Sequence, residues 1–218
     1  MEFKGCSARP QKAHSRDFAC CDIGLVRRIT AKRRAKVNIR VIAGLYGGRT
    51  IQGSGTDRTH PMGERVRNAL FNKIANEIGG ATVLDAFAGS GALGIEALSR
   101  GAASVTFIER DRIAQKVIEA NLGQLGIDRR HARLIKSPVA SVAQTLDVTF
   151  DLIFADPPYH DTQFSTVAKL FDLLKPNGLM VLSYPGKGEV PTGAEVVVVD
   201  NRSYGNAALA FYRKKNVQ

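Results

Sequence analysis

The chain has 218 residues, 44% of them hydrophobic, and these values predict a single domain with a sizeable core. No apolar run approaches the roughly 18 residues that span a membrane, and no apolar secretory segment opens the chain. We therefore expect a cytoplasmic protein without a membrane partner. Its three cysteines, Cys6, Cys20 and Cys21, are too few for a disulfide framework. They form no C-x-x-C pair, so free thiols are favoured over a zinc site with His14.

The net charge of +11 is concentrated near the N-terminus. Residues 1–40 hold 11 Lys/Arg and 3 Asp/Glu, whereas residues 41–218 hold 20 and 17. Such a basic run binds polyanions without sequence choice. A solvated tail without a role is an alternative, as is an upstream translation before a natural start near Val37. We expect residues 1–37 to be a disordered basic extension and residues 38–218 to be one domain.

From residue 38 onward, strand-like and helix-like segments alternate. A hairpin over 38–52 is expected first, with glycines in its turn, and then a helix over 64–78 with one apolar stripe. Further strands are expected over 81–86, 103–109, 132–135, 150–155 and 178–183, with helices over 91–100, 111–124, 138–146 and 162–174. Antiparallel strands near 195–200 and 207–213 close the chain. This alternation predicts an α/β fold with a mostly parallel sheet and helices on both faces.

A glycine loop follows the first expected sheet strand. Gly89, Gly91 and Gly94 satisfy G-x-G-x-x-G, a weak pattern that also occurs in nicotinamide and flavin sites. Asp85 at the strand end argues against such a site, because its charge would face a pyrophosphate of the same sign. It complements instead the ammonium and sulfonium of S-adenosylmethionine (AdoMet).

The next expected strand ends at Glu109. An acidic residue at this point can accept hydrogen bonds from both hydroxyls of a ribose. The alternative is a solvated charge within the cluster 109–112. The order of strand, loop, helix, strand and acid favours the ribose role.

Asp156-Pro157-Pro158-Tyr159 follows the apolar run 150–155, so it should lie just beyond the carboxyl end of a buried strand. The prolines remove two amide donors, which leaves carbonyl and carboxylate acceptors, and Tyr159 adds a flat face. These groups suit a planar ligand that carries an amine. An ordinary Asp-Pro turn is the alternative, but the aromatic fourth residue and the glycine loop favour a site.

In this order, the motifs resemble class I AdoMet-dependent N-methyltransferases. Four segments narrow the resemblance to the bacterial 16S ribosomal RNA guanine-N2 methyltransferases of the RsmD type. These segments are RVIAG at 40–44, RTHPMGERVRNALFN at 58–72, LDAFAGSGALG at 84–94 and YGNAALAFY at 204–212. The resemblance implies a Rossmann-like class I fold with seven strands and AdoMet as the cofactor. It also implies ribosomal RNA or a small-subunit particle as the partner. We expect a monomer and no metal.

The resemblance also implies roles for single residues. Asp156 and the Pro157 carbonyl are expected to grip the guanine amine, while Tyr159 stacks on the flipped base. Cofactor contacts are expected from Asp85, Phe87, Gly89, Ser90, Gly91, Gly94, Glu109, Arg110 and Ser137. For Ser137, a helix N-cap ahead of Pro138 is the alternative.

RNA contacts are expected from a group of basic residues on the hairpin and in or just after the loop that follows it: Arg40, Arg49, Arg58, His60, Arg65 and Arg67. Arg65 and Arg67 are two positions apart, so they cannot share one helix face. One of them could instead bind AdoMet or brace the DPPY loop, and for either the further alternatives are a salt bridge with Glu64 or a solvated helix edge.

Four other functions fit part of the pattern. A DNA adenine or cytosine amino-methyltransferase also uses DPPY but generally needs a target-recognition domain. A protein-glutamine methyltransferase suits the pocket, yet the arginines favour a phosphate partner. A dinucleotide oxidoreductase is disfavoured by Asp85, and a non-catalytic RNA-binding module is disfavoured because neither motif is degraded.

Overall fold

The computed structural model of the chain describes residues 37–55 and 62–216. The predicted basic extension before Val37 lies outside the described residues, as do Arg58 and His60. Within the described ranges, no helix is long and apolar enough to cross a membrane.

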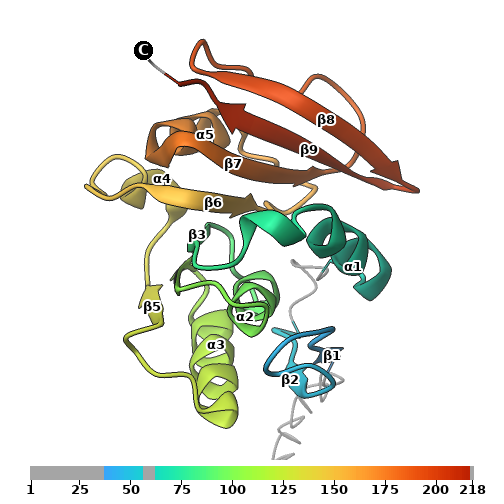
Figure 1. The fold of residues 1–218 in the computed structure, drawn as a ribbon, viewed down its shortest axis with the longest axis vertical. Helices are drawn as coiled ribbons and strands as arrows, with labels where there is room; N and C mark the ends of the chain where they lie inside the picture. Colours follow the sequence, from blue (N-terminus) through green and yellow to red (C-terminus); the bar gives the residue numbers. More distant parts are fainter. Residues whose placement is uncertain (1–36, 56–61, 217–218) are drawn as a thin grey trace, which may run out of the picture. The chain divides into compact units, whose positions relative to one another are not determined.

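A seven-stranded sheet with the order β5-β4-β3-β6-β7-β9-β8 organises the domain (Figure 1). The strands are β3 (Thr82–Asp85), β4 (Ser104–Ile108), β5 (Ala132–Ile135), β6 (Phe150–Ala155), β7 (Leu174–Tyr184), β8 (Val196–Tyr204) and β9 (Ala207–Lys214). Neighbours from β5 to β7 are parallel, whereas β9 is antiparallel to both β7 and β8. The predicted mostly parallel sheet with antiparallel strands at its C-terminal edge is confirmed.

Helices cover both faces of this sheet because strand residues point alternately to either side. Phe107 and Phe154 belong to the core that includes residues of α1 (Glu64–Lys73), α2 (Ala92–Ser99) and α3 (Arg112–Leu125). Ile108 and Ile153 belong to the core that includes residues of α4 (Val139–Val142) and α5 (Phe164–Lys169). Short 3-10 turns follow α1 at Ala75–Glu77 and α5 at Leu170–Leu173.

Three predicted helices are shorter in the structure. The helix predicted over 64–78 ends at Lys73 and is followed by the 3-10 turn. The helix predicted over 138–146 is limited to α4, after which the chain continues in turns to residue 145. There the Thr145 hydroxyl donates to the Ser141 carbonyl (3.2 Å), a local bond that competes with regular helix. The helix predicted over 162–174 ends at Lys169 and tightens into the 3-10 turn.

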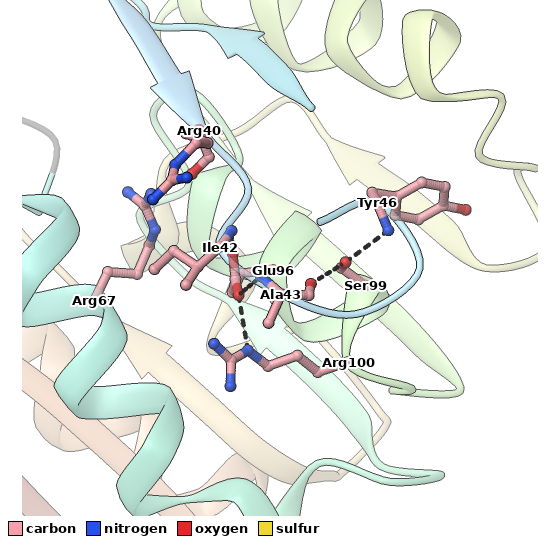
Figure 2. A network of polar contacts seen from close by, with 8 residues as sticks. All are labelled: Arg40, Ile42, Ala43, Tyr46, Arg67, Glu96, Ser99 and Arg100. Atoms are coloured by element: carbon pink, nitrogen blue, oxygen red, sulfur yellow. Dashed lines mark hydrogen bonds and ion pairs between the residues drawn. The ribbon is translucent and has the colours of Figure 1, made fainter. Parts of the chain in front are cut away.

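The predicted hairpin is present as β1 (Asn38–Arg40) and β2 (Thr50–Gln52), which pair antiparallel. Its first strand is shorter than expected, because the chain beyond Val41, residues 42–46, turns away to contact α2 (Figure 2). The amides of Ile42 and Ala43 donate to the Glu96 carboxylate at 2.7 and 3.2 Å. These bonds replace the pairing that a longer strand would have made.

The order of the strands places a topological switch point between β3 and β6. From β3 the chain runs outward through β4 to β5, then returns to pair β6 with the other side of β3. Open α/β sheets bind ligands outside the carboxyl ends of the strands at such a point. The glycine loop follows β3 and the DPPY segment follows β6, so both motifs lie at this switch point.

Candidate active site

Two cavities open at the carboxyl ends of β3 and β6, and they share Phe87, Asp156, Pro158 and His160 as lining residues. The smaller one, of about 280 Å³, is also lined by Ile108, Glu109, Arg110, Asp111, Pro138 and Val139. We call it the Glu109 cavity. The larger one, of about 600 Å³, is also lined by Met62, Arg67, Gly89, Ser90, Tyr159 and Tyr204. We call it the Tyr159 cavity.

The glycine loop is fixed by two carboxylates. Gly89 has a φ of 54°, a left-handed conformation that favours glycine, and its amide donates to Glu109 Oε2 at 2.8 Å. The amide of Gly94 donates to Asp85 Oδ2 at 3.0 Å. Gly89 and Ser90 line the Tyr159 cavity, whereas Gly91 and Gly94 line neither cavity. The loop therefore presents only its first turn to a ligand.

Asp85 stands behind the loop rather than in a cavity. Only 1% of its surface is exposed, and it lines neither cavity. Burial raises its pKa to about 7. The charges of Asp156 and Glu109 also raise this pKa, whereas the hydrogen bond from the Gly94 amide lowers it. Asp85 thus orders the loop and adds negative potential, while the predicted contact with the cofactor stays a prediction.

Glu109 lines the smaller cavity and is held in one orientation. Besides the Gly89 bond, its Oε1 accepts the Asp111 amide at 2.7 Å, and its backbone carbonyl accepts Gln115 Nε2 at 2.8 Å. Burial raises the pKa of Glu109, and the backbone amides oppose this effect. Each carboxylate oxygen has a further lone pair, so the side chain can still accept hydrogen bonds from a ligand.

The DPPY segment continues from β6 into a turn that the Asp161 amide closes on the Pro158 carbonyl (2.8 Å). Asp156 lines both cavities, and burial raises its pKa to about 6. Tyr159 is 40% exposed, and its hydroxyl lies 2.8 Å from the hydroxyl of Ser183 on β7. Pro157 is buried and lines the Tyr159 cavity.

The carboxylates of Asp85, Glu109 and Asp156 form an acidic site. Across residues 37–55 and 62–216, none of the three has an ion-pair partner. The same ranges contain no group of His, Cys, Asp and Glu side chains that could hold a metal ion. The charges of Asp156 and Glu109 raise the pKa of Asp85, and uncompensated carboxylates favour a ligand that carries positive charge.

The predicted RNA contacts divide into exposed and buried residues. Arg40 and Arg49 are exposed, and they bond to the Glu64 carboxylate and the Gln124 carbonyl respectively. Arg65 is exposed on α1. Arg67 is 2% exposed and donates to the carbonyls of Arg40 (2.6 Å) and Met62 (3.3 Å). Arg65 and Arg67 thus lie on different faces, and Arg67 braces the wall of the Tyr159 cavity.

Arg110 and Ser137 were both expected near the cofactor. Arg110 lines the Glu109 cavity, but Ser137 does not; Pro138 and Val139 form that part of the wall. The alternative role of Ser137 as a helix N-cap is wrong, because Pro138 occupies the N-cap position of α4 without a side-chain cap.

Several buried polar residues that shape the site were not predicted. Asn121 on α3 is fully buried and connects the hairpin to the glycine loop. Its amide group bonds to the Gln52 backbone (2.8 and 2.9 Å) and donates to the Ser90 carbonyl (3.0 Å). Ser183 was also missed. For Ser183 the signal in the sequence is one polar residue within an apolar segment, whereas Asn121 lies among other polar residues of α3 and gives no such signal.

On α2, Glu96 and Ser99 anchor the segment 41–46, as Figure 2 shows. The Ser99 hydroxyl donates to the Ala43 carbonyl and accepts the Tyr46 amide at 2.9 Å. Arg100 Nε donates to Glu96 Oε1 at 2.7 Å. Because α2 follows the glycine loop directly, this anchor joins the hairpin to the element that begins at the cavities.

A family model described as Conserved hypothetical protein 95 matches residues 39–213. The chain belongs to this family. Ribosomal RNA small subunit methyltransferase D of Haemophilus influenzae is 38% identical over 184 residues, covering 82% of this chain and 95% of that protein. "Putative rRNA methyltransferase YlbH" of Bacillus subtilis is 33% identical over 184 residues, with coverages of 81% and 100%. The predicted resemblance to RsmD-type methyltransferases is confirmed.

A solved structure agrees with this membership. "Putative methyltransferase yhhF" from Escherichia coli superposes with a TM-score of 0.72 at 33% identity, covering 82% of this chain and 99% of that one. The family match spans the hairpin, both cavities and the C-terminal strands. The whole candidate site therefore lies in the part of the chain that the family shares.

Proposed function

We propose that this protein is a ribosomal RNA methyltransferase that uses AdoMet and acts on the N2 amine of a guanine in small-subunit RNA. One observation carries the proposal: Asp156 and Pro158 line both an acidic cavity suited to a cationic cofactor and a larger cavity beside Tyr159. A relative named as a ribosomal RNA small subunit methyltransferase supports the substrate class.

The Glu109 cavity fits the nucleoside part of AdoMet. Glu109 would accept the ribose hydroxyls, and Pro138 and Val139 would pack against the adenine. Uncompensated negative charge from Asp85 and Asp156 would favour the sulfonium and ammonium groups. When bound, AdoMet supplies an electrophilic methyl group.

The DPPY residues would prepare the amine. A guanine amine is a poor nucleophile because its lone pair is delocalised into the ring. Hydrogen bonds from its two N–H groups to Asp156 and the Pro157 carbonyl would turn that lone pair out of conjugation. Tyr159 would stack on the extruded base, and Asp156 would take the proton that the methylated nitrogen releases. Positioning accounts for most of the catalysis in this scheme.

Exposed basic residues outside the two cavities would bind the phosphates of the RNA. Arg65 is exposed and lies two residues after Gly63, which lines the Tyr159 cavity. Beyond the N-terminal run, the surplus of basic residues lies in one segment. Residues 110–136 hold seven Lys/Arg and three Asp/Glu, whereas the rest of 41–218 holds 13 and 14. Phosphate contacts from this segment would supply affinity, while the cavity supplies base choice.

The position of the C-terminal strands supports RNA over DNA as substrate. After the DPPY loop and α5, residues 174–214 form β7 to β9 of the same sheet. In the part of the chain that the structure describes, nothing after Tyr159 forms a separate target-recognition domain.

The direct test is transfer from labelled AdoMet to small-subunit RNA and particles, followed by nucleoside mass spectrometry. N2-methylguanosine at one mapped position is expected from the wild type and not from Asp156→Ala, which should still bind AdoMet. Methylation of adenine or cytosine, or of protein glutamine, would contradict the proposal.

The cofactor is tested separately by calorimetry. Glu109→Ala should weaken AdoMet binding by about 1–3 kcal/mol, because charge-assisted hydrogen bonds to the ribose are lost. Binding of NADH without binding of AdoMet would contradict this assignment.

A further inference from the structure

Ser183 lies where it can contact both functional side chains of the DPPY segment. It is the penultimate residue of β7, and 2% of its surface is exposed. In the parallel pairing of β6 with β7, Ala155 is opposite Leu182. The next residues on each strand, Asp156 and Ser183, are therefore neighbours at the carboxyl ends of the two strands.

The hydroxyl of Ser183 has two partners there. It lies 2.8 Å from the Tyr159 hydroxyl, and the strand register brings it beside the Asp156 carboxyl, where a hydrogen bond from Ser183 lowers the pKa of that carboxyl. An ionised carboxylate only accepts hydrogen bonds, and a serine hydroxyl has one proton. The chain of donors must then run in one direction: Tyr159 O–H donates to Ser183 Oγ, and Ser183 O–H donates to Asp156.

We propose that Ser183 is a positioning residue for methyl transfer, which orients the Asp156 carboxylate and the Tyr159 ring together. This inference rests on the proposed function. With one oxygen occupied by Ser183, the carboxylate presents the other to the amine. With its hydroxyl held, the exposed Tyr159 ring keeps one orientation toward the base before RNA binds.

Packing in the core does not account for a serine at this position. The neighbouring β7 residues Met180, Val181, Leu182 and Tyr184 are all in the two hydrophobic cores. A buried hydroxyl among them costs stability unless it is hydrogen-bonded. Both of its partners belong to the DPPY segment, so the hydrogen bonds that offset this cost are made at the candidate active site. Preorganised groups lose less entropy when the ligand binds, which is how such a tether raises the rate.

Two substitutions separate the bonds that Ser183 makes. Ser183→Ala removes both, and we expect the single-turnover rate on RNA to fall about tenfold or more. The acid limb of its pH–rate profile should move to higher pH, because a bond to the ionised carboxylate is lost. Tyr159→Phe keeps the bond to Asp156, so the limb should stay in place while the Michaelis constant for RNA rises. Ser183→Cys, which is close in volume, should behave like Ser183→Ala.

Thr166→Val is the matched control, since it removes a buried hydroxyl from α5 outside both cavities. It should leave the rate and the pH profile unchanged. The Asp156 carboxyl is also titrated by ¹³C NMR in the free protein, where Ser183→Ala should raise its pKa. This measurement needs no activity, so a wild type inactive on RNA would contradict the proposed function alone. A folded Ser183→Ala with the wild-type rate, Michaelis constant and titration would overturn the role of Ser183.

Discussion

The Asp156 carboxyl shows how burial and function compete at a single residue. Burial raises its pKa to about 6, yet the proposed reaction needs the ionised form as an acceptor. A pKa in this range leaves the group mostly ionised at neutral pH, and it makes the carboxylate a better proton acceptor than an exposed aspartate.

We therefore predict that the single-turnover rate rises with pH through a midpoint near 6 and is level above about 7. The carboxyl is protonated below its pKa, so it cannot then accept the amine N–H. Rates measured from pH 5 to pH 8 at saturating cofactor check this. Asp156→Asn, with no ionisable group, should be nearly inactive at every pH; a flat wild-type profile would contradict the assignment.

Asp85 leads to a prediction about stability. Its pKa is near 3.8 in the unfolded chain and about 7 in the fold. Between these values the folded state binds the extra proton, so stability should fall as pH rises from about 4 to 7. Asp85→Asn removes this loss. The melting temperature of the variant minus that of the wild type should therefore be larger at pH 8 than at pH 4. Thermal unfolding at both pH values measures the difference.

The cofactor supplies the control for Asp85. AdoMet carries a sulfonium and an ammonium, so its binding should favour the ionised carboxylate. The thermal shift caused by AdoMet should therefore be larger at pH 8 than at pH 5 in the wild type. In Asp85→Asn this part of the pH dependence should disappear. Equal shifts in both proteins at both pH values would show that Asp85 does not sense the ligand.

At the scale of elements, α2 is held close to the sheet by a glycine. A Cβ built at Gly94 would lie 2.2 Å from the ring of Phe107, which is fully buried and cannot move aside. We predict that Gly94→Ala destabilises the protein by about 1–3 kcal/mol through overpacking. Gly123→Ala is the control, because its Cβ would meet open space on α3. It should stabilise by about 0.5–1 kcal/mol. Chemical denaturation of both variants measures the contrast.

Periodicity predicted which sheet strands exist better than it predicted their ends. The bounds predicted for β5 and β6 agree with the structure. In contrast, β7 begins four residues before the predicted 178–183, and β8 continues four residues beyond the predicted 195–200. The segment 41–46 was predicted as the end of the first hairpin strand, 39–44, and the start of its turn, 45–48. Its conformation is set instead by Glu96 and Ser99, more than 50 residues away. No local pattern encodes such contacts.

The site itself was predicted to a similar extent. Motif order was enough to bring the Asp156 and Glu109 side chains to the same end of the sheet. The residues that hold these side chains in place could not be predicted from the sequence, because a bond such as the one between Ser183 and Tyr159 depends on strand register. Arg67 illustrates the same limit, since only the packing of α1 shows that it is buried.

At the scale of the whole molecule, the distribution of charge indicates a surface that could hold the proposed RNA substrate. In the segment 110–136, two of the three acids are already paired, Glu119 with Lys136 and Asp128 with Arg130. The exposed Arg112 begins α3, where a positive charge opposes the helix dipole. Helix stability therefore does not explain this residue, whereas the proposed binding of RNA phosphates would.

The last prediction tests this surface. Arg112 and Lys116 lie one turn apart on α3, both exposed, and Arg112 follows Arg110 and Asp111 of the Glu109 cavity. Neutralising both, as Arg112→Gln with Lys116→Gln, should raise the Michaelis constant for RNA. It should also flatten the dependence of log KM on log salt by roughly 1–2, because two phosphate contacts are lost.

The matched control neutralises two exposed lysines at the other end of the strands. Lys169 lies beside Thr149, just before β6 begins, and Lys215 follows the end of β9 near Glu195. Lys169→Gln with Lys215→Gln removes the same net charge from the molecule, so any general electrostatic effect is equal in the two proteins. AdoMet affinity should be unchanged in both, and only the α3 variant should lose RNA affinity. If the two variants respond to salt alike, the molecule attracts RNA through its total charge, and α3 makes no phosphate contacts of its own.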